Sequence, residues 1–93
     1  MITIHKQTFP MQIEFDLMLP RPVSILKIAM QDGRSTMWYL CDSTSAEKWK
    51  TFYLYGTGHD IGTMENKRYI ETFFDGPFVW HLFEHTQPEE GKT

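Results

Sequence analysis

The chain has 93 residues, a formal charge of −3 at neutral pH and a single cysteine, Cys41. This length is enough for one domain, and one cysteine excludes an intramolecular disulfide and any zinc site built from several cysteines. The acidic balance argues against nucleic acid as a partner, because binding to a phosphate backbone needs a concentrated positive field.

Two adjoining patterns open the chain. Apolar residues occupy every odd position from Phe9 to Leu19, with polar or charged residues at most positions between them. Strict alternation is typical of a half-buried strand, with Pro10 and Pro20 limiting its pairing at the two ends. Ile2 and Ile4 alternate in the same way and predict a short leading strand.

A hairpin is expected in the next third of the sequence. From Val23 to Met30 the apolar positions change phase, which indicates a β-bulge or burial on both faces. Asp32-Gly33 then has the turn chemistry for a hairpin into a strand over residues 36–41. The polar residues 42–48 predict a loop or one helical turn.

The remaining segments complete a β fold. Residues 49–55, 69–74 and 78–83 are aromatic-rich and predict strands, the last two joined by the hairpin signal Asp75-Gly76-Pro77. Residues 61–67 predict a loop. We therefore expect a mainly β, single-domain antiparallel barrel or sandwich of six to seven short strands with little helix. The domain is expected to cover residues 1–86, with a frayed polar tail over 87–93.

Four segments together resemble a known group of proteins. They are FYLYGTGHDI at 52–61, MWYLCD at 37–42, RYIETF at 68–73 and FVWHLFE at 78–84. The chain resembles, over nearly its whole length, a family of small uncharacterised bacteriophage and prophage proteins. The resemblance implies a phage accessory protein in the cytoplasm of a bacterial host, and it implies no catalytic role. Asp60 stands where that family more commonly has proline.

The segment YGTGHD at 55–60 is the first candidate site. Its two glycines suggest a phosphate-binding loop, but the third glycine of a dinucleotide motif would fall at Ile61, and Gly62 disfavours a following helix. We expect a strand-ending turn that contacts a ligand or partner. Trp49, between two lysines, is expected to be exposed, whereas Trp38 and Trp80 are expected in the core. The predicted binding residues are Tyr55, Gly56, Thr57, Gly58, His59, Asp60 and Trp49.

Catalytic and metal sites are weaker alternatives. His59 with Asp60 suggests a base and its orienting carboxylate, but adjacent residues seldom point at one atom, and no Ser or Cys nucleophile stands in a recognisable setting. His81 and His85 would lie roughly 13 Å apart on a strand, too far to chelate, although His59, His81 and Glu84 could meet across strands. We predict no catalytic residue, no cofactor and no metal.

The predicted function is that of a small non-catalytic binding protein in the host cytoplasm, without membrane contact. We expect a counter-defence factor that inhibits a bacterial immune protein or sequesters its nucleotide signal. The alternatives are a small hydrolytic enzyme using His59 and Asp60, and a structural accessory protein that forms a homo-oligomer. The sequence leaves open whether its basic residues form one patch: Lys48, Lys50, Lys67 and Arg68.

Overall fold

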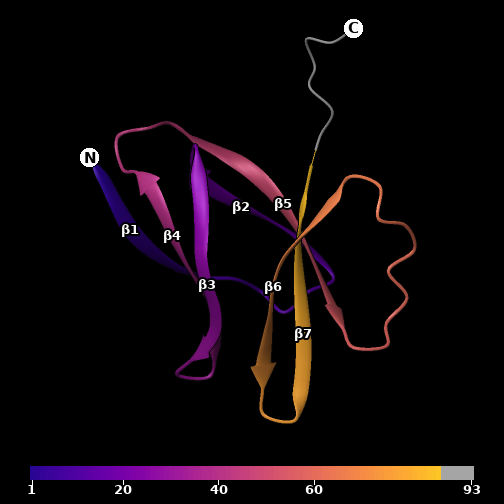
Figure 1. Ribbon diagram of the computed structural model, residues 1–93. Helices are drawn as coiled ribbons and strands as arrows, with labels where there is room; N and C mark the ends of the chain where they lie inside the picture. Colours follow the sequence, from indigo (N-terminus) through magenta and orange to yellow (C-terminus); the bar gives the residue numbers. More distant parts are fainter. Residues whose placement is uncertain (87–93) are drawn as a thin grey trace, which may run out of the picture.

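Seven antiparallel strands make up the fold in a computed structural model that describes residues 1–86 (Figure 1). The tail predicted over 87–93 lies outside the described residues. No helix occurs in the described part of the chain, so the mainly β prediction is confirmed. The strands are β1 (Ile2–Thr8), β2 (Glu14–Pro20), β3 (Val23–Gln31), β4 (Arg34–Asp42), β5 (Glu47–Gly56), β6 (Lys67–Asp75) and β7 (Phe78–His85).

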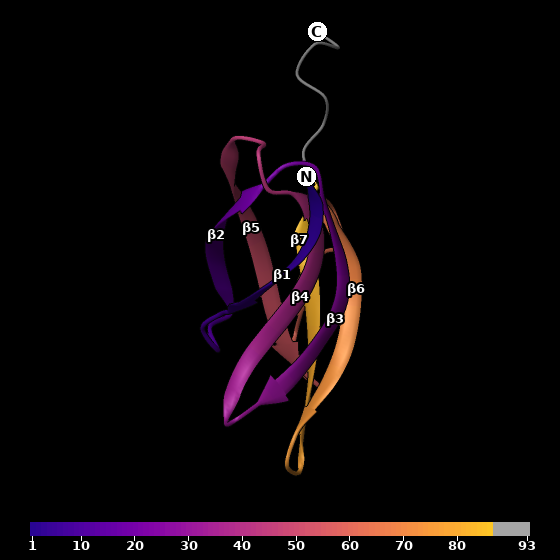
Figure 2. The same cartoon turned by 90° about the vertical axis from the view of Figure 1, so that its left-hand side faces the viewer.

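The strands form two sheets that face each other as a sandwich. One sheet has the order β1-β4-β3 and the other β2-β5-β7-β6, and Figure 2 shows the three-stranded sheet in front of the four-stranded one. The sheets do not close into a barrel. Where the edges of β3 and β6 meet, Glu71 of β6 accepts the backbone N–H of Ile28 at 3.1 Å and pairs with Lys27 at 3.3 Å, which joins the sheets through side chains.

The core lies between the sheets and follows the alternation of the strands. Phe15, Leu17 and Leu19 of β2 point inward, and the residues between them, Asp16 and Met18, are exposed. Phe9 stacks on Phe15 with ring centroids 5.2 Å apart. The fully buried large side chains come from both sheets, so each sheet depends on the other for burial. They are Phe52, Leu19, Ile28, Met37, Leu82 and Thr36.

The single strand predicted from Phe9 to Leu19 is wrong in its first half. The backbone N–H of Phe9 donates to the Ser35 carbonyl at 3.0 Å and so stays with β4. The chain then crosses to the other sheet, where the carbonyl of Ile13 accepts the N–H of Leu54 at 2.9 Å. Ile13 is 67% exposed despite its place in the apolar pattern. The connection over 9–13 therefore bridges the two sheets and is not a strand.

Two local predictions for β3 and β4 are confirmed. The pairing of β3 with β4 shifts between Ile25 and Lys27, so the change of apolar phase does mark a bulge. Asp32 and Gly33 both adopt positive φ, at 52° and 76°. This is the conformation of a two-residue type I′ hairpin, whose twist matches that of the flanking strands.

The three tryptophans are placed differently from one another. Trp49 is 66% exposed, as predicted, and Trp80 is partly buried against the core. The prediction for Trp38 is wrong, because Met37 and Tyr39 point into the core and the alternation of β4 turns Trp38 to the outer face, where it is half-buried.

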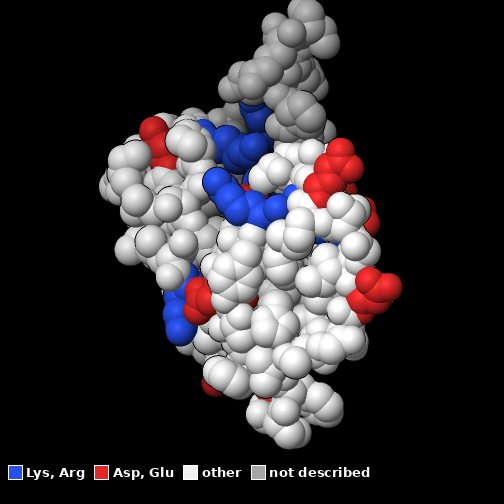
Figure 3. Space-filling model, turned by 45° about the vertical axis from the view of Figure 1, so that its right-hand side comes forward, with Lys and Arg blue, Asp and Glu red and all other residues white. Residues whose placement is uncertain are grey.

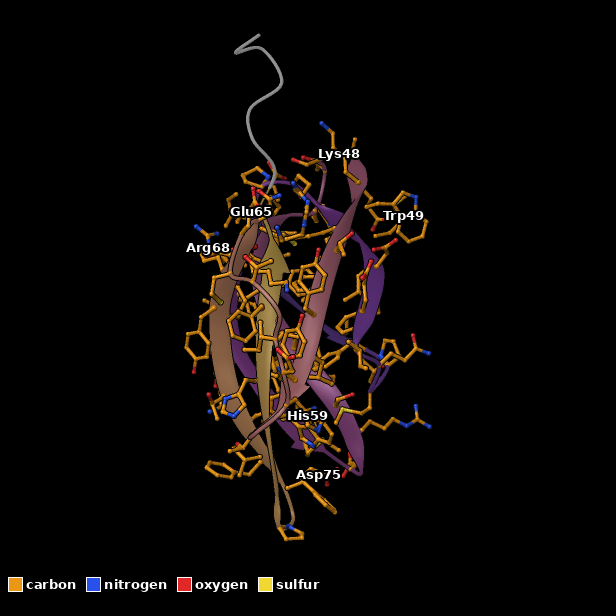
Figure 4. All side chains as sticks on the ribbon, turned by 90° about the vertical axis from the view of Figure 1, so that its right-hand side faces the viewer. Lys48, Trp49, His59, Glu65, Arg68 and Asp75 are labelled. Atoms are coloured by element: carbon orange, nitrogen blue, oxygen red, sulfur yellow. The ribbon has the colours of Figure 1, made fainter. Side chains whose placement is uncertain are left out.

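The connection between β5 and β6 is long because of the topology. Both strands are antiparallel to β7, which lies between them, so the chain must return along the sheet before β6 begins. Residues 57–66 run in front of the four-stranded sheet in Figure 4. Lys67 is hydrogen-bonded to this connection: its Nζ donates to the carbonyls of Ile61 and Thr63, both at 2.9 Å. The ammonium lies 5.3 Å from the centroid of the Tyr53 ring.

Candidate functional site

The YGTGHD segment forms a turn at the end of β5. Tyr55 and Gly56 are the last residues of the strand, and residues 57–60 are exposed. Tyr55 is only 8% exposed; the Lys67 ammonium lies 5.4 Å from its ring centroid. The backbone N–H of Thr57 donates to the Val79 carbonyl at 3.2 Å, and that of His59 donates to the Gly56 carbonyl at 3.0 Å. These two hydrogen bonds connect the turn to β7 and close it on Gly56.

The side chain of His59 folds back over the strand end. Its Nδ1 accepts the backbone N–H of Gly56 at 3.0 Å, and its ring meets the edge of Trp80 with centroids 6.1 Å apart. A Cβ at position 56 would lie 3.0 Å from Cε1 of this ring, so any other residue there would require the ring to shift. Because Nδ1 is an acceptor, a neutral His59 carries its proton on Nε2.

Asp60 does not orient His59. Its Oδ1 accepts the backbone N–H of Gly62 at 2.8 Å, which is an Asx turn that stabilises the start of the long connection. The two side chains therefore serve separate backbone groups. The hypothesis of a His59–Asp60 catalytic pair has no geometric support in this arrangement.

A second histidine, His81, lies at the centre of a hydrogen-bonded array that the sequence analysis missed. Its Nε2 is 2.8 Å from the Thr57 hydroxyl and its Nδ1 is 2.9 Å from the Thr72 hydroxyl. Thr72 is in turn 2.7 Å from the Tyr69 hydroxyl. The array joins the end of β5 to β7 and β6 on the outer face of the sheet. The alternation of β7 could have indicated this position, because it places His81 on the face opposite to that of buried Leu82.

Two shallow hollows flank the turn. One, of about 270 Å³, lies on the outer face among Tyr55, Ile61, His81 and Phe83. The other, of about 300 Å³, also borders His59 and lies among Trp80, Val79 and Phe78. Phe78 is 61% exposed. We call residues 55–60, together with His81 and Phe78, the turn site.

Trp49 does not belong to the turn site. Figure 4 shows Trp49 beside Lys48 at one end of the sandwich and His59 near the other end, close to Asp75. Trp49 instead lines a small cavity with Arg21, Lys50, Thr51 and His85. The predicted binding residues therefore divide into six that lie together and one that lies apart.

Two of the four basic residues meet at one carboxylate. Lys50 and Arg68 converge on buried Glu84: the Lys50 ammonium is 2.7 Å from its Oε1, and the Arg68 guanidinium binds its Oε2. Lys67 lies instead on the outer face, and Lys48 is exposed. In Figure 3, most of the Lys and Arg atoms on the face shown lie in its upper part, and a separate group lies at the lower left.

Opposing influences act on the pKa of Glu84. Burial raises it, but the hydrogen bonds and positive charges of Lys50 and Arg68 outweigh that effect and hold the pKa below its ordinary value. Glu84 is therefore an ionised structural group. Since it points between the sheets while His81 points to the outer face, the alternative metal site of His59, His81 and Glu84 does not form. Residues 1–86 contain no group of three or more potential ligands that could hold a metal ion.

Comparison with known proteins identifies a family. No curated protein and no solved structure matches the chain. Within residues 1–86 no helix is long and apolar enough to cross a membrane. A family described as a domain of unknown function, DUF7352, matches residues 1–93, and the chain therefore belongs to this family.

Proposed function

We propose that this protein is a small, phage-encoded binding protein without catalytic activity, and that it uses the turn site to occupy a host protein. The observation that carries the proposal is that polar side chains of the turn are hydrogen-bonded within the protein. Nδ1 of His59, Oδ1 of Asp60 and the hydroxyl of Thr57 all have partners within the protein. Such groups hold a loop in a defined shape, and a preorganised loop loses little freedom on binding.

The surroundings of the turn favour a protein over a small ligand. Phe74 and Phe78 are 67% and 61% exposed near the β6–β7 hairpin, and exposed aromatic side chains are enriched in protein interfaces. The two hollows, of about 270 and 300 Å³, are at the lower limit of ligand pockets. The exposed aromatic side chains beside the turn are suited to contact a protein surface. The hollows are too small to enclose a typical metabolite.

The biological role we propose is counter-defence in the host cytoplasm, by inhibition of a bacterial immune protein. The resemblance to small phage and prophage proteins supports this role. A form in which the protein sequesters a nucleotide signal of the immune system belongs to the same role.

The proposal is tested by infection and by affinity capture. Bacteria carrying one immune system and expressing this protein are infected with a phage that the system restricts. We expect plaque numbers to rise with the wild type and to stay restricted with a Thr57→Ala, His59→Ala, Phe78→Ser variant. In affinity capture from the same bacteria, the wild-type protein should retain the immune protein and the triple variant should not.

The matched control is Ile4→Ser, which removes a side chain that is 57% exposed on the outer face of the other sheet. It should behave as the wild type does. Restriction that persists across a panel of immune systems would overturn the role in counter-defence. Capture that survives in the turn variant would overturn the assignment of the binding surface.

One observation favours hydrolysis as a second candidate. The Thr57 hydroxyl and Nε2 of His81 are 2.8 Å apart, within the reach of a nucleophile and its general base. A hydroxyl, Thr72, and not a carboxylate, lies behind the imidazole. Turnover of ester or phosphodiester substrates that disappears in both Thr57→Ala and His81→Ala, with unchanged melting temperature, would replace the binding proposal.

A further inference from the structure

A second candidate site lies at the other end of the sandwich. β7 ends at His85, whereas the pairing of β5 with β2 continues as far as Glu47. This part of β5 pairs with β2 on one side and has no partner on the β7 side. Beside it is a cavity of about 140 Å³, lined by Arg21, Trp49, Lys50, Thr51 and His85. We propose that this cavity binds the phosphate of a mononucleotide, whose base stacks on Trp49.

Positive charge is in excess around the cavity. Lys50 lines it and shares the carboxylate of Glu84 with Arg68. Arg21 adds a third cation from the connection between β2 and β3. Three cations therefore lie near two carboxylates, buried Glu84 and exposed Asp16, which leaves one positive charge in excess to attract an anion. The guanidinium of arginine matches the oxygens of a phosphate.

Arg21 has a nitrogen that lacks an acceptor. Its Nη1 is buried and makes no hydrogen bond within the described residues. Buried donors in folded proteins nearly always have partners, so an unpaired guanidinium nitrogen calls for an acceptor that residues 1–86 do not provide. An oxyanion in the adjoining cavity would supply that acceptor.

The size of the cavity fits a phosphate group and excludes a whole nucleotide. At about 140 Å³ it is well below the roughly 300–1,000 Å³ of typical small-molecule pockets, so it suits a group of a few heavy atoms. The rest of the ligand must lie outside the cavity. The Thr51 hydroxyl already donates to Asp16 at 2.6 Å, and Nδ1 of His85 is 2.8 Å from the Tyr53 hydroxyl. This leaves Arg21, Lys50 and Nε2 of His85 to contact the phosphate.

Trp49 provides the surface for the rest of the ligand. Its indole is 66% exposed and forms part of the cavity wall. Stacking of a base on an aromatic side chain contributes about 1–3 kcal/mol. Since the whole chain has a formal charge of −3, a single nucleotide fits this site better than a polyanionic nucleic acid. The site lies at the opposite end from the turn site, so either proposal can fail alone.

The test compares three probes with the full chain: 5′-AMP, inorganic phosphate and adenosine. Calorimetry and the indole N–H signal of Trp49 in NMR spectra report binding. We expect AMP to bind about tenfold or more tightly than either fragment. Arg21→Met should weaken AMP and phosphate about tenfold, as expected for a lost charge-assisted hydrogen bond. Trp49→Ala should weaken AMP and leave phosphate unchanged.

Lys48→Met is the matched control, because it removes one positive charge at the same end without lining the cavity. It should change AMP affinity by less than about twofold. The wild-type NMR titration decides the matter even if Arg21→Met fails to fold. No shift of the Trp49 signal up to about 10 mM AMP would overturn the proposal. Equal affinity for AMP and phosphate would overturn its nucleotide part, and tighter binding of an oligonucleotide than of AMP would replace it with a nucleic-acid site.

Discussion

The imidazole of His59 rests directly on Gly56, whose backbone N–H donates to Nδ1 at 3.0 Å. A methyl group at position 56 would lie 3.0 Å from Cε1 of the ring. We expect Gly56→Ala to push the exposed ring away and to break this hydrogen bond, lowering the free energy of unfolding by about 1 kcal/mol. Urea denaturation measures the loss, and the His59 Cε1–H signal in NMR spectra should move toward that of a free histidine.

A double-mutant cycle tests the cause. In a His59→Ala background the ring is absent, so adding Gly56→Ala should cost much less than it does in the wild type. The expected coupling is about 1 kcal/mol. Equal costs in the two backgrounds would mean that the strand end itself, and not the histidine, requires glycine.

Lys67 should control the mobility of the connection over 57–66. Its Nζ binds the carbonyls of Ile61 and Thr63 at 2.9 Å. Lys67→Met keeps an apolar side chain and loses both hydrogen bonds, together with the ammonium over the tyrosine rings. We expect about 1–2 kcal/mol lower stability and faster amide hydrogen exchange in 61–66. Exposed Lys48→Met should leave exchange there unchanged, and unaltered exchange in the Lys67 variant would contradict the assignment.

The Asp32-Gly33 hairpin provides a test of backbone strain. Gly33 has a φ of 76°, with open space around a Cβ built at that position. Gly33→Ala should therefore destabilise through conformation alone, by about 1–2 kcal/mol. Asp32→Asn is the control, since asparagine tolerates positive φ, and its effect should stay within about 0.5 kcal/mol. Thermal unfolding measures both, and a neutral Gly33→Ala would mean that the turn relaxes to another type.

Local rules predicted the parts of the fold that depend on neighbours in the sequence. The alternation of Phe15 with Leu17 and the turn pair Asp32-Gly33 each determine their conformation within a few residues. The same rule failed over 9–13, because an apolar pattern does not show that the chain leaves one sheet for the other. Ile13 fits the alternation and is 67% exposed.

The candidate sites were predicted less completely, because they depend on the register between strands. Adjacent His59 and Asp60 looked like a pair in sequence and bind different backbone groups. Thr57 and His81 are 24 positions apart and are joined by a hydrogen bond. Nothing local in the sequence marks such a pairing, or the convergence of Lys50 on Glu84.

Glu84 should be among the residues most important for stability. Its side chain is 5% exposed and that of Lys50 is 13% exposed, with Nζ and Oε1 2.7 Å apart. Glu84→Gln leaves the Lys50 charge buried, so we expect a loss of about 3 kcal/mol or more. Adding Lys50→Met should recover part of it, because no buried charge then remains. Exposed Glu65→Gln, as a control, should stay within about 0.5 kcal/mol.

The pH dependence of unfolding gives an independent test of the same group. Burial raises the pKa of Glu84, but Lys50 and Arg68 together hold it below the ordinary value. The unfolded state therefore binds the proton more readily, so the stabilisation is complete above the unfolded pKa of about 4.3 and is lost as pH falls through the folded value. The stability difference between wild type and Glu84→Gln should shrink as pH falls from about 5 to about 3. Urea midpoints that keep a constant difference over this range would show that the carboxylate is not stabilised by its two cations.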